Sequence, residues 1–413
     1  MSSRRRNESP FISQPGVYIQ ELPSSGRPIQ ATNTSTAGFV GAAPNPDARP
    51  NEAVVLHNFT DFRETFMLTV DGRANPPTTT DHGWSLLAHA VYGFFLNGGS
   101  RCWVVNVGGD DASQKPLDDG SGTVGLAVLA AIDEISIVAA PGYTDTTNHE
   151  AILAHCEQTG DRIGILDIKK EPAAGAAWTA AAVEKIATDH LQVTRPGNGI
   201  ITTYFPWLQV ANPANPQSGA TVVVPPSGHV AGIWARTDAT RGVHKAPANE
   251  VINGVIGLDF AVTDQLNTSL NEAGINAIRF FSGEGYKIWG ARTLASNSEW
   301  RYVNVRRLLT NLEESIAEGT RWSVFEPNNE ELWRAIRRDV GAFLTDFWQA
   351  GALMGSTAEE AFFVKCDAEN NPLDSIRDGK VIIDIGVAPT YPAEFVIFRI
   401  SQQESGAEIE SFS

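Results

Sequence analysis

The side chains best suited to metal-assisted chemistry are two histidines and a glutamate that lie close together in the chain. His149 and Glu150 are adjacent, and His155 follows six positions after His149. A zinc hydrolase motif of this kind requires histidines four residues apart, so that both imidazoles share one helical face with the glutamate as base. The observed spacing does not meet that requirement. We therefore predict that these are histidines on the surface of a helix and that the chain has no metal site.

Glycine-rich loops that bind phosphate are the second kind of site to consider. Gly283-Glu284-Gly285 has Ile288 where a dinucleotide-binding fingerprint needs its third glycine, and no GxxxxGK[ST] sequence occurs. Those glycines are required because the backbone must approach a pyrophosphate closely. We predict no cofactor.

Nucleophilic and acid–base catalysis lack a recognisable constellation as well. The chain has no GxSxG elbow, and its three cysteines, Cys102, Cys156 and Cys366, are far apart and are expected to be small buried hydrophobic residues. The pairs Asp118-Asp119 and Glu359-Glu360 are adjacent, so their side chains point in different directions on a helix or strand. Solvated charges are the better interpretation, with Glu359-Glu360 opening a helix after Ser356-Thr357. No catalytic, cofactor-binding or metal-binding residue is predicted.

The elements that would position any site alternate between strand and helix from residue 101 to about 204. Runs such as Ile163 to Leu166 are apolar throughout, which is typical of strands that are covered on both faces. The pattern predicts a mixed α/β fold. Strands are expected at 37–41, 102–107, 135–139, 163–168, 199–204, 277–281, 286–289, 322–325, 362–365 and 381–386. Helices are expected at 61–67, 84–96, 126–132, 150–158, 180–190, 228–234, 303–318 and from 327–331 onward.

Composition limits the possible partners. The 413 residues carry a net charge of −17, which disfavours general binding to nucleic acid or to anionic membranes. The longest apolar stretch, Leu86 to Leu96, is shorter than the roughly 20 residues of a spanning helix. Arg4-Arg5-Arg6 is not followed by the apolar core of a secretory signal, so we expect a chain that folds in the cytoplasm, without membrane insertion.

Two terminal runs and one helix face could contact partners. Val17 to Leu22 and Phe395 to Ile400 are strand-like and apolar, and they lie beside polar or Pro/Gly/Ser-bearing segments. Each could pair within its own domain or add to the sheet edge of a neighbour. Arg334, Arg337 and Arg338 share one side of an amphipathic helix, where they could be solvated or could bind an acidic partner.

Several longer runs resemble the contractile tail sheath family of phage tails, R-type bacteriocins and extracellular contractile injection systems. The resemblance covers residues 15–41, 85–107 and about 222–400, and it is only a broad pattern over about 108–220. Its motifs are Pro15-Gly16-Val17-Tyr18, Thr34-Ser35-Thr36-Ala37-Gly38-Phe39-Val40-Gly41, Phe94-Phe95-Leu96-Asn97-Gly98-Gly99, Gly274-Ile275-Asn276-Ala277-Ile278-Arg279, Trp289-Gly290-Ala291-Arg292, Phe325-Glu326-Pro327-Asn328 and Pro392-Ala393-Glu394-Phe395.

The resemblance implies a sheath core domain built from N- and C-terminal segments, an inserted α/β outer domain, and extended strand-forming arms. The implied divisions are an N-terminal arm with a linking strand at 1–26, the first part of the core at 27–100, and the variable outer domain at 101–220. The conserved C-terminal sheath domain would follow at 221–392, and the C-terminal arm with its linking strand at 393–413.

The resemblance also implies a structural subunit. Sheath subunits form stacked sixfold rings around an inner tube, contract from a metastable extended state, and meet baseplate and terminal cap proteins. Intersubunit strands would be formed by Val17, Tyr18, Ile19, Gln20, Glu21 and Leu22, and by Phe395, Val396, Ile397, Phe398, Arg399 and Ile400. Candidate tube contacts are Arg306, Arg307, Arg334, Arg337 and Arg338. A cytoplasmic α/β enzyme with an unrecognised site is the alternative, and a capsid or other shell protein is a third possibility.

Overall fold

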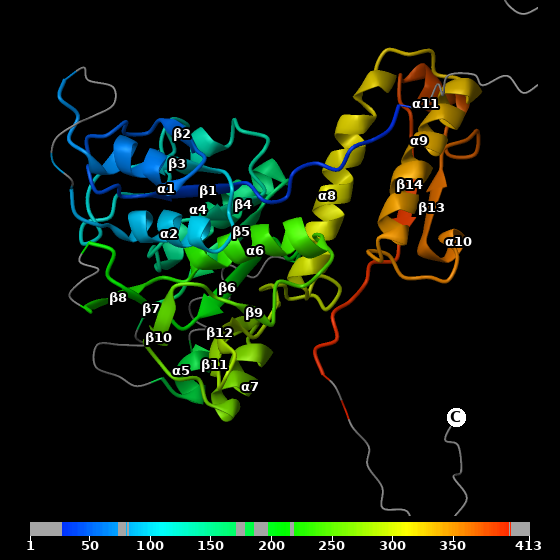
Figure 1. Ribbon diagram of the computed structural model, residues 1–413. Helices are drawn as coiled ribbons and strands as arrows, with labels where there is room; N and C mark the ends of the chain where they lie inside the picture. The colour runs from blue at the N-terminus through cyan, green and yellow to red at the C-terminus, as the bar shows by residue number, and fades with distance from the viewer. Residues whose placement is uncertain are drawn as a thin grey trace, which may run out of the picture.

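The computed structural model describes residues 27–72, 80, 82–170, 178–185, 197–214, 219–395 and 397. It consists of a large body, residues 36–302, and a small body, residues 303–390, with a long helix beside the junction between them (Figure 1). The mixed α/β fold class is confirmed.

A nine-stranded sheet forms the centre of the large body. Its middle strands are parallel, from β3 to β11, and antiparallel strands flank them on both sides. The strand order is β2 (Ala53–Leu56), β3 (Cys102–Asn106), β1 (Ala37–Gly41), β4 (Ile137–Ala139), β5 (Ile163–Asp167), β6 (Ile201–Phe205), β11 (Ile275–Phe281), β12 (Gly285–Ile288) and β9 (Glu250–Val251). The divisions expected at 100/101 and 220/221 both run through this sheet, because β1 lies between β3 and β4 and β11 lies beside β6.

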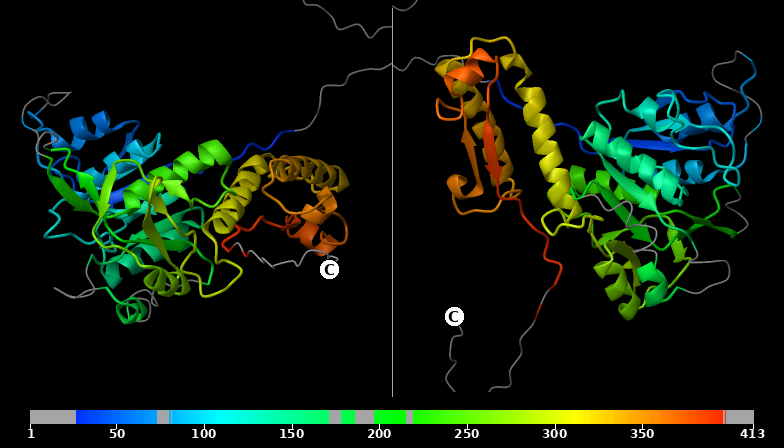
Figure 2. Two further views of the ribbon diagram at one scale, coloured as in Figure 1. Left: turned by 60° about the horizontal axis from the view of Figure 1, so that its bottom comes forward. Right: turned by 180° about the vertical axis from the view of Figure 1, so that it is seen from behind.

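Helices cover both faces of the sheet, as the apolar strands predicted (Figure 2). Successive side chains of β1 point to opposite faces of the sheet, because Phe39 and Val40 belong to different buried clusters. One face packs against α1 (Phe59–Phe62), the π-helical turn Arg63–Met67, α2 (Leu86–Leu96) and α6 (Ser227–Arg241). The other packs against α3 (Leu126–Leu129), α4 (Thr146–Thr159), α5 (Ala180–Lys185) and α7 (Asp264–Glu272). A three-stranded antiparallel sheet, β10 (Val255–Leu258), β7 (Leu208–Ala211) and β8 (Thr221–Val224), completes the body.

Helix α6 contains glycines because it crosses α2 at close range. A Cβ on Gly228 would lie 2.4 Å from backbone atoms of Ala90, and one on Gly232 would lie 2.3 Å from the carbonyl oxygen of Phe94. Only glycine fits at these positions. The segment expected as a helix at 228–234 is therefore a longer helix in which packing outweighs the low helix propensity of glycine.

The small body contains its own apolar core. Leu332, Ile336, Val340 and Phe343 are buried on one side of the second long helix, as their spacing predicted. Its elements are α8 (Val303–Gly319), α9 (Glu330–Gln349), α10 (Ala358–Ala361), β13 (Phe362–Lys365), α11 (Leu373–Arg377) and β14 (Asp384–Val387). The strand expected at 322–325 was wrong. A 3-10 turn, Arg321–Ser323, and a bend occupy this position because the chain must reverse between two packed helices.

The histidines of α4 were predicted on its surface, and this was wrong. His149 is fully buried, and its Nε2 lies 3.2 Å from the carbonyl oxygen of Tyr143 and 3.0 Å from that of Asp167. His155 lies against Arg162. The two histidines lie on the side of α4 that packs against the sheet, so both are buried.

Acidification is expected to destabilise the large body. Burial lowers the pKa of His89, His155 and His229 to about 4. Between pH 6.5 and 4 these three histidines are therefore protonated in the unfolded chain but neutral in the folded chain. Burial raises the pKa of Asp167 to about 6, so this group has the opposite effect between pH 6 and 3.8. The three histidines outweigh Asp167, and the net effect of these four groups is a free energy of unfolding that should fall by about 4 kcal/mol from pH 7 to pH 5.

Urea denaturation followed by tryptophan fluorescence at both pH values measures this change. Asp167→Asn removes the opposing contribution, so the decline on acidification should become steeper in that variant. A free energy of unfolding that stays constant between pH 7 and pH 5 contradicts the prediction.

Candidate functional site

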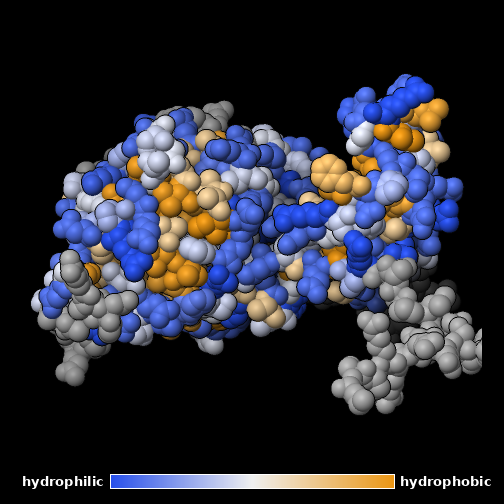
Figure 3. Space-filling view, turned by 90° about the horizontal axis from the view of Figure 1, so that it is seen from above, coloured by the Kyte–Doolittle hydropathy of each residue, from blue (hydrophilic) through white to orange (hydrophobic). Residues whose placement is uncertain are grey.

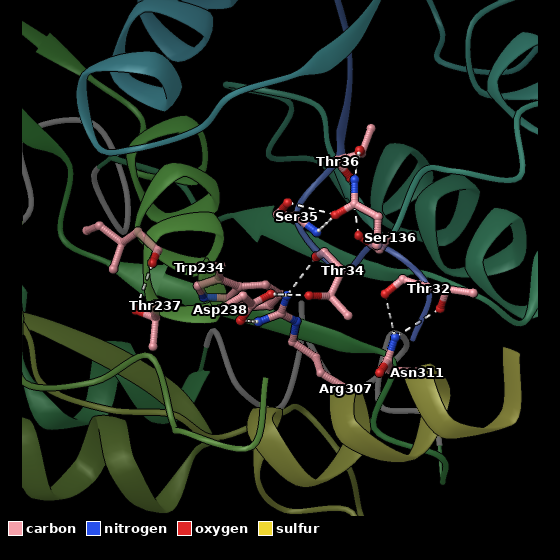
Figure 4. Close-up of polar contacts among 12 residues, drawn as sticks. Thr32, Thr34, Ser35, Thr36, Ser136, Trp234, Thr237, Asp238, Arg307 and Asn311 are labelled. Atoms are coloured by element: carbon pink, nitrogen blue, oxygen red, sulfur yellow. Dashed lines mark hydrogen bonds and ion pairs between the residues drawn. The ribbon is translucent and has the colours of Figure 1, made fainter. Parts of the chain in front are cut away.

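The junction between the two bodies is held by a buried ion pair. Arg307 of α8 donates from Nη1 to Oδ1 of Asp238 at 2.9 Å and from Nη2 to the carbonyl oxygen of Thr34 at 2.9 Å (Figure 4). The guanidinium carbon also lies 4.6 Å from the centre of the Trp234 ring. The side chains of Arg307 and Asp238 are only 3% and 6% exposed. One arginine thus joins α8, α6 and the N-terminal segment.

The segment before β1 follows α8 toward the far end of the small body (Figures 1 and 4). The Asn311 amide donates to the carbonyl oxygen and hydroxyl of Thr32, both at 2.9 Å, and the Thr32 amide donates to Ser315 Oγ at 2.9 Å. Farther along, the guanidinium of Arg27 stacks 4.7 Å from the ring centre of Trp322. The described chain begins at this residue, so the root of the N-terminal arm lies beyond the C-terminal end of α8.

The root of the C-terminal arm lies near the opposite end of α8. Glu394 accepts hydrogen bonds from Nε and Nη2 of Arg292 at 2.8 and 2.7 Å, from the Asn271 amide at 2.9 Å and from the Tyr302 hydroxyl at 3.0 Å. Burial raises the pKa of Glu394, but these hydrogen bonds outweigh it and hold the pKa below its usual range. The carboxylate therefore clamps the arm to the large body.

The predicted linking strands are only partly visible. Val17 to Leu22, Val396 and residues 398–400 lie outside the described residues. Phe395 and Ile397 are described, and they are 71% and 79% exposed directly after the clamp. Their strand exchange stays a prediction.

The arginines predicted to contact a tube fall into two groups. Arg306 and Arg307 are 7% and 4% exposed. In this conformation both side chains are buried and bind other residues of the same chain, so they are not available at the surface. Arg306 donates to Thr310 and Glu313 and lies 4.4 Å from the Trp300 ring centre. The sequence predicted a helix at 303–318, but it could not show that Arg306 and Arg307 would be buried.

Arg334, Arg337 and Arg338 lie on the outer side of α9, where their tube contact stays a prediction. Arg334 is 3.7 Å from Glu330, and Arg337 is 3.9 Å from Asp367. Arg338 donates to Asp339 at 3.0 Å. These side chains are 36–64% exposed, so they remain accessible to a partner.

A short sheet in the small body was only partly anticipated. β13 and β14 pair only with each other as named strands among the described residues, which leaves outer edges where a further strand could add. α9 covers one face of the pair. The sequence predicted both β13 and β14, but it could not show that they form a sheet of only two strands among the described residues.

Sites for small-molecule chemistry are not evident in the described part of the chain. Residues in the described ranges include no group of three or more histidine, cysteine or acidic side chains that could hold a metal ion. The three cysteines are buried and free, and burial raises the pKa of each thiol. No helix within those ranges combines the length and apolarity needed to cross a membrane.

Comparison with protein families gives two adjoining matches. The phage tail sheath protein central domain matches residues 107–294, and the phage tail sheath C-terminal domain matches residues 295–403. A putative prophage major tail sheath protein of Pseudomonas aeruginosa (strain UCBPP-PA14) is 26% identical over 271 residues, which are 64% of each chain. The tail sheath protein of Escherichia phage P2 is 27% identical over 41% of this chain and 42% of the phage protein. The matches thus span less than two thirds of these relatives.

Solved structures match over nearly the whole chain. The sheath complex of the PVC extracellular contractile injection system, in its contracted state, is 29% identical with a TM-score of 0.75, covering 95% of this chain and 98% of that one. The helical sheath of the anti-feeding prophage, also contracted, is 30% identical with a TM-score of 0.67, covering 95% and 99%. The chain belongs to the contractile tail sheath family, whose members are structural proteins and not enzymes.

Proposed function

We propose that this chain is the sheath subunit of a contractile, tail-like machine. It polymerises as stacked sixfold rings around an inner tube and contracts from a metastable extended state to drive the tube through a target envelope. The observation that carries the proposal is the near-complete match to contracted sheath structures at 29–30% identity. The arms, rooted at Arg27 and Glu394, pair with sheets of neighbouring copies while the bodies move as rigid units.

The partners follow from this role. They are further copies of the chain, the inner tube protein, and baseplate and terminal cap proteins. Assembly takes place in the bacterial cytoplasm, and the subunit becomes part of a tail-like particle. The similarity to the sheath of the PVC extracellular contractile injection system, which covers 95% of this chain, supports such a particle as one machine that the subunit could build.

Negative-stain electron microscopy of the purified chain tests the proposal, first alone and then with the product of its neighbouring tube gene. We expect hollow, striated cylinders. Small uniform particles in both samples at high concentration contradict the proposal. Closed shells contradict it too, because they indicate a capsid.

A further inference from the structure

An exposed aromatic ring stands at the far end of the small body. Phe325 is fully exposed and has a φ of 68°, a left-handed conformation that is a genuine outlier for a bulky residue. Val324 beside it is 62% exposed, and Glu326 is exposed without a cationic partner among the described residues. We call Val324, Phe325 and Glu326 the knob. Figure 3 shows apolar residues among polar ones at the end of the small body that faces the viewer.

Hydrogen bonds to neighbouring residues hold the loop that carries the knob in place. The Asn328 amide donates to the carbonyl oxygen of Lys380 at 2.9 Å, and its oxygen accepts from the Trp333 indole at 2.8 Å. The Glu326 amide donates to the carbonyl oxygen of Ser323 at 3.1 Å. The fold therefore holds Phe325 in a strained conformation, although its ring is left in solvent. Strain of this kind is typical of positions that act in binding.

A hollow of about 840 Å³ lies near the other end of α8, and we call it the cup. Trp289 and Tyr391 line it and are 41% and 49% exposed. Arg241 also lines it and has no carboxylate partner among the described residues. Burial is the main cause that lowers the pKa of His244 and Lys245, and the charge of the neighbouring Arg241 adds to it. The two carboxylates of the cup already have cations: Glu250 lies 3.8 Å from Arg236, and Glu394 binds Arg292.

The knob and the cup cannot meet within one chain. Tyr302 and Asn304 line the cup at the start of α8, whereas the knob follows the end of this helix. The 17 residues of α8 separate them by about 25 Å. The two surfaces are nevertheless complementary in chemistry. The knob presents the Phe325 ring and the Glu326 carboxylate, whereas the cup presents aromatic side chains and the Arg241 guanidinium.

We propose that the knob of one copy inserts into the cup of a second copy. Two different surfaces that join head to tail produce an open helical array instead of a closed dimer. The contact rests on the proposed function, because it is one of the body-to-body interfaces of the sheath. It would act in addition to any pairing of the terminal arms.

Cysteine cross-linking tests the contact directly, since the three native cysteines are buried. Phe325→Cys and Asn267→Cys subunits, the latter changed at the cup lining, are co-assembled and oxidised. We expect a cross-linked dimer from this pair. Phe325→Cys with Val70→Cys, an exposed position on the large body, is the control that should give none. Cylinders formed by the wild-type chain test the proposed function separately. If cylinders form but Phe325→Cys and Asn267→Cys give no cross-link, only this inference is overturned. A cross-link from Phe325→Cys to the tube protein overturns it too.

Phe325→Asn separates binding from folding. Asparagine tolerates a positive φ, so the melting temperature of the monomer should stay the same or rise. Loss of a buried phenylalanine at each contact should raise the critical concentration for assembly by about ten- to a hundredfold. Glu326→Lys and Arg241→Glu should each weaken assembly, and the two together should restore it. An unchanged critical concentration in Phe325→Asn, or no recovery in the double variant, overturns the contact.

Discussion

Replacement of Asp238 by alanine should lower the free energy of unfolding by about 3–5 kcal/mol, because it leaves the Arg307 guanidinium buried without its counter-charge. The two side chains are 3% and 6% exposed, so water cannot replace the lost partner. Thr34, which donates from its hydroxyl to Asp238 at 2.6 Å, also loses an acceptor. Urea denaturation followed by tryptophan fluorescence measures the change, and the Trp234 ring beneath Arg307 makes the signal sensitive to this junction.

Asp264 provides a matched control. It forms an ion pair with Arg279 at 2.6 Å, but its side chain is 92% exposed. Asp264→Ala should cost less than about 1 kcal/mol, because solvent screens the pair and hydrates the remaining charge. Changing Asp238 to leucine together with Arg307 to methionine should recover part of the loss, since both buried charges are removed. Equal costs for Asp238→Ala and Asp264→Ala would show that the junction does not depend on the buried pair.

Truncation of either arm should abolish assembly while the bodies stay folded. Removing residues 1–22 deletes Val17 to Leu22, and ending the chain after Glu394 deletes the run from Phe395 to Ile400. Both truncations keep the arm roots, Arg27 on Trp322 and Glu394 on Arg292. Without main-chain pairing between neighbours, we expect no cylinders by electron microscopy at concentrations where the full chain forms them.

Shorter truncations serve as controls for the arms. Residues 1–9 and 404–413 lie outside the runs that resemble sheath proteins and outside the matched C-terminal domain, which ends at residue 403, so their removal should leave cylinder formation intact. Circular dichroism and thermal melting of all four truncated chains verify that the bodies remain folded. Cylinders formed by a folded chain that lacks either run would exclude that run as an essential linking strand.

These predictions distinguish two kinds of connection in the molecule. The contacts around Arg307 are buried and join three elements into one unit, so the two bodies are expected to turn together. The arms begin where burial ends, since Phe395 follows the Glu394 clamp and is already 71% exposed. If the arms pair with neighbouring copies as proposed, a rigid unit can change its position relative to its neighbours without losing its attachment to them, as the proposed contraction requires.

The sequence by itself determined most of the elements. The apolar run in β5 and the helical period of α9 are local patterns, and burial against one or two faces produces them directly. The missing phosphate loop and zinc spacing were also decided locally, because such motifs bring their ligands together within a few residues. The short strands β7, β8 and β10 were not predicted, since four-residue runs carry little periodicity.

Only the tertiary structure decided what the charged residues do. Arg307 looked like a surface cation in the sequence, yet its partners are 69 and 273 positions away, at Asp238 and Thr34. Glu394 belonged to a motif that resembles the family, but its partners gave no signal, because the residues that clamp it come from segments 92 to 123 positions earlier. The knob and the cup likewise depend on which ends of α8 they occupy. A side chain's type is fixed by the sequence, but its burial and its partners depend on chain segments that only folding brings together.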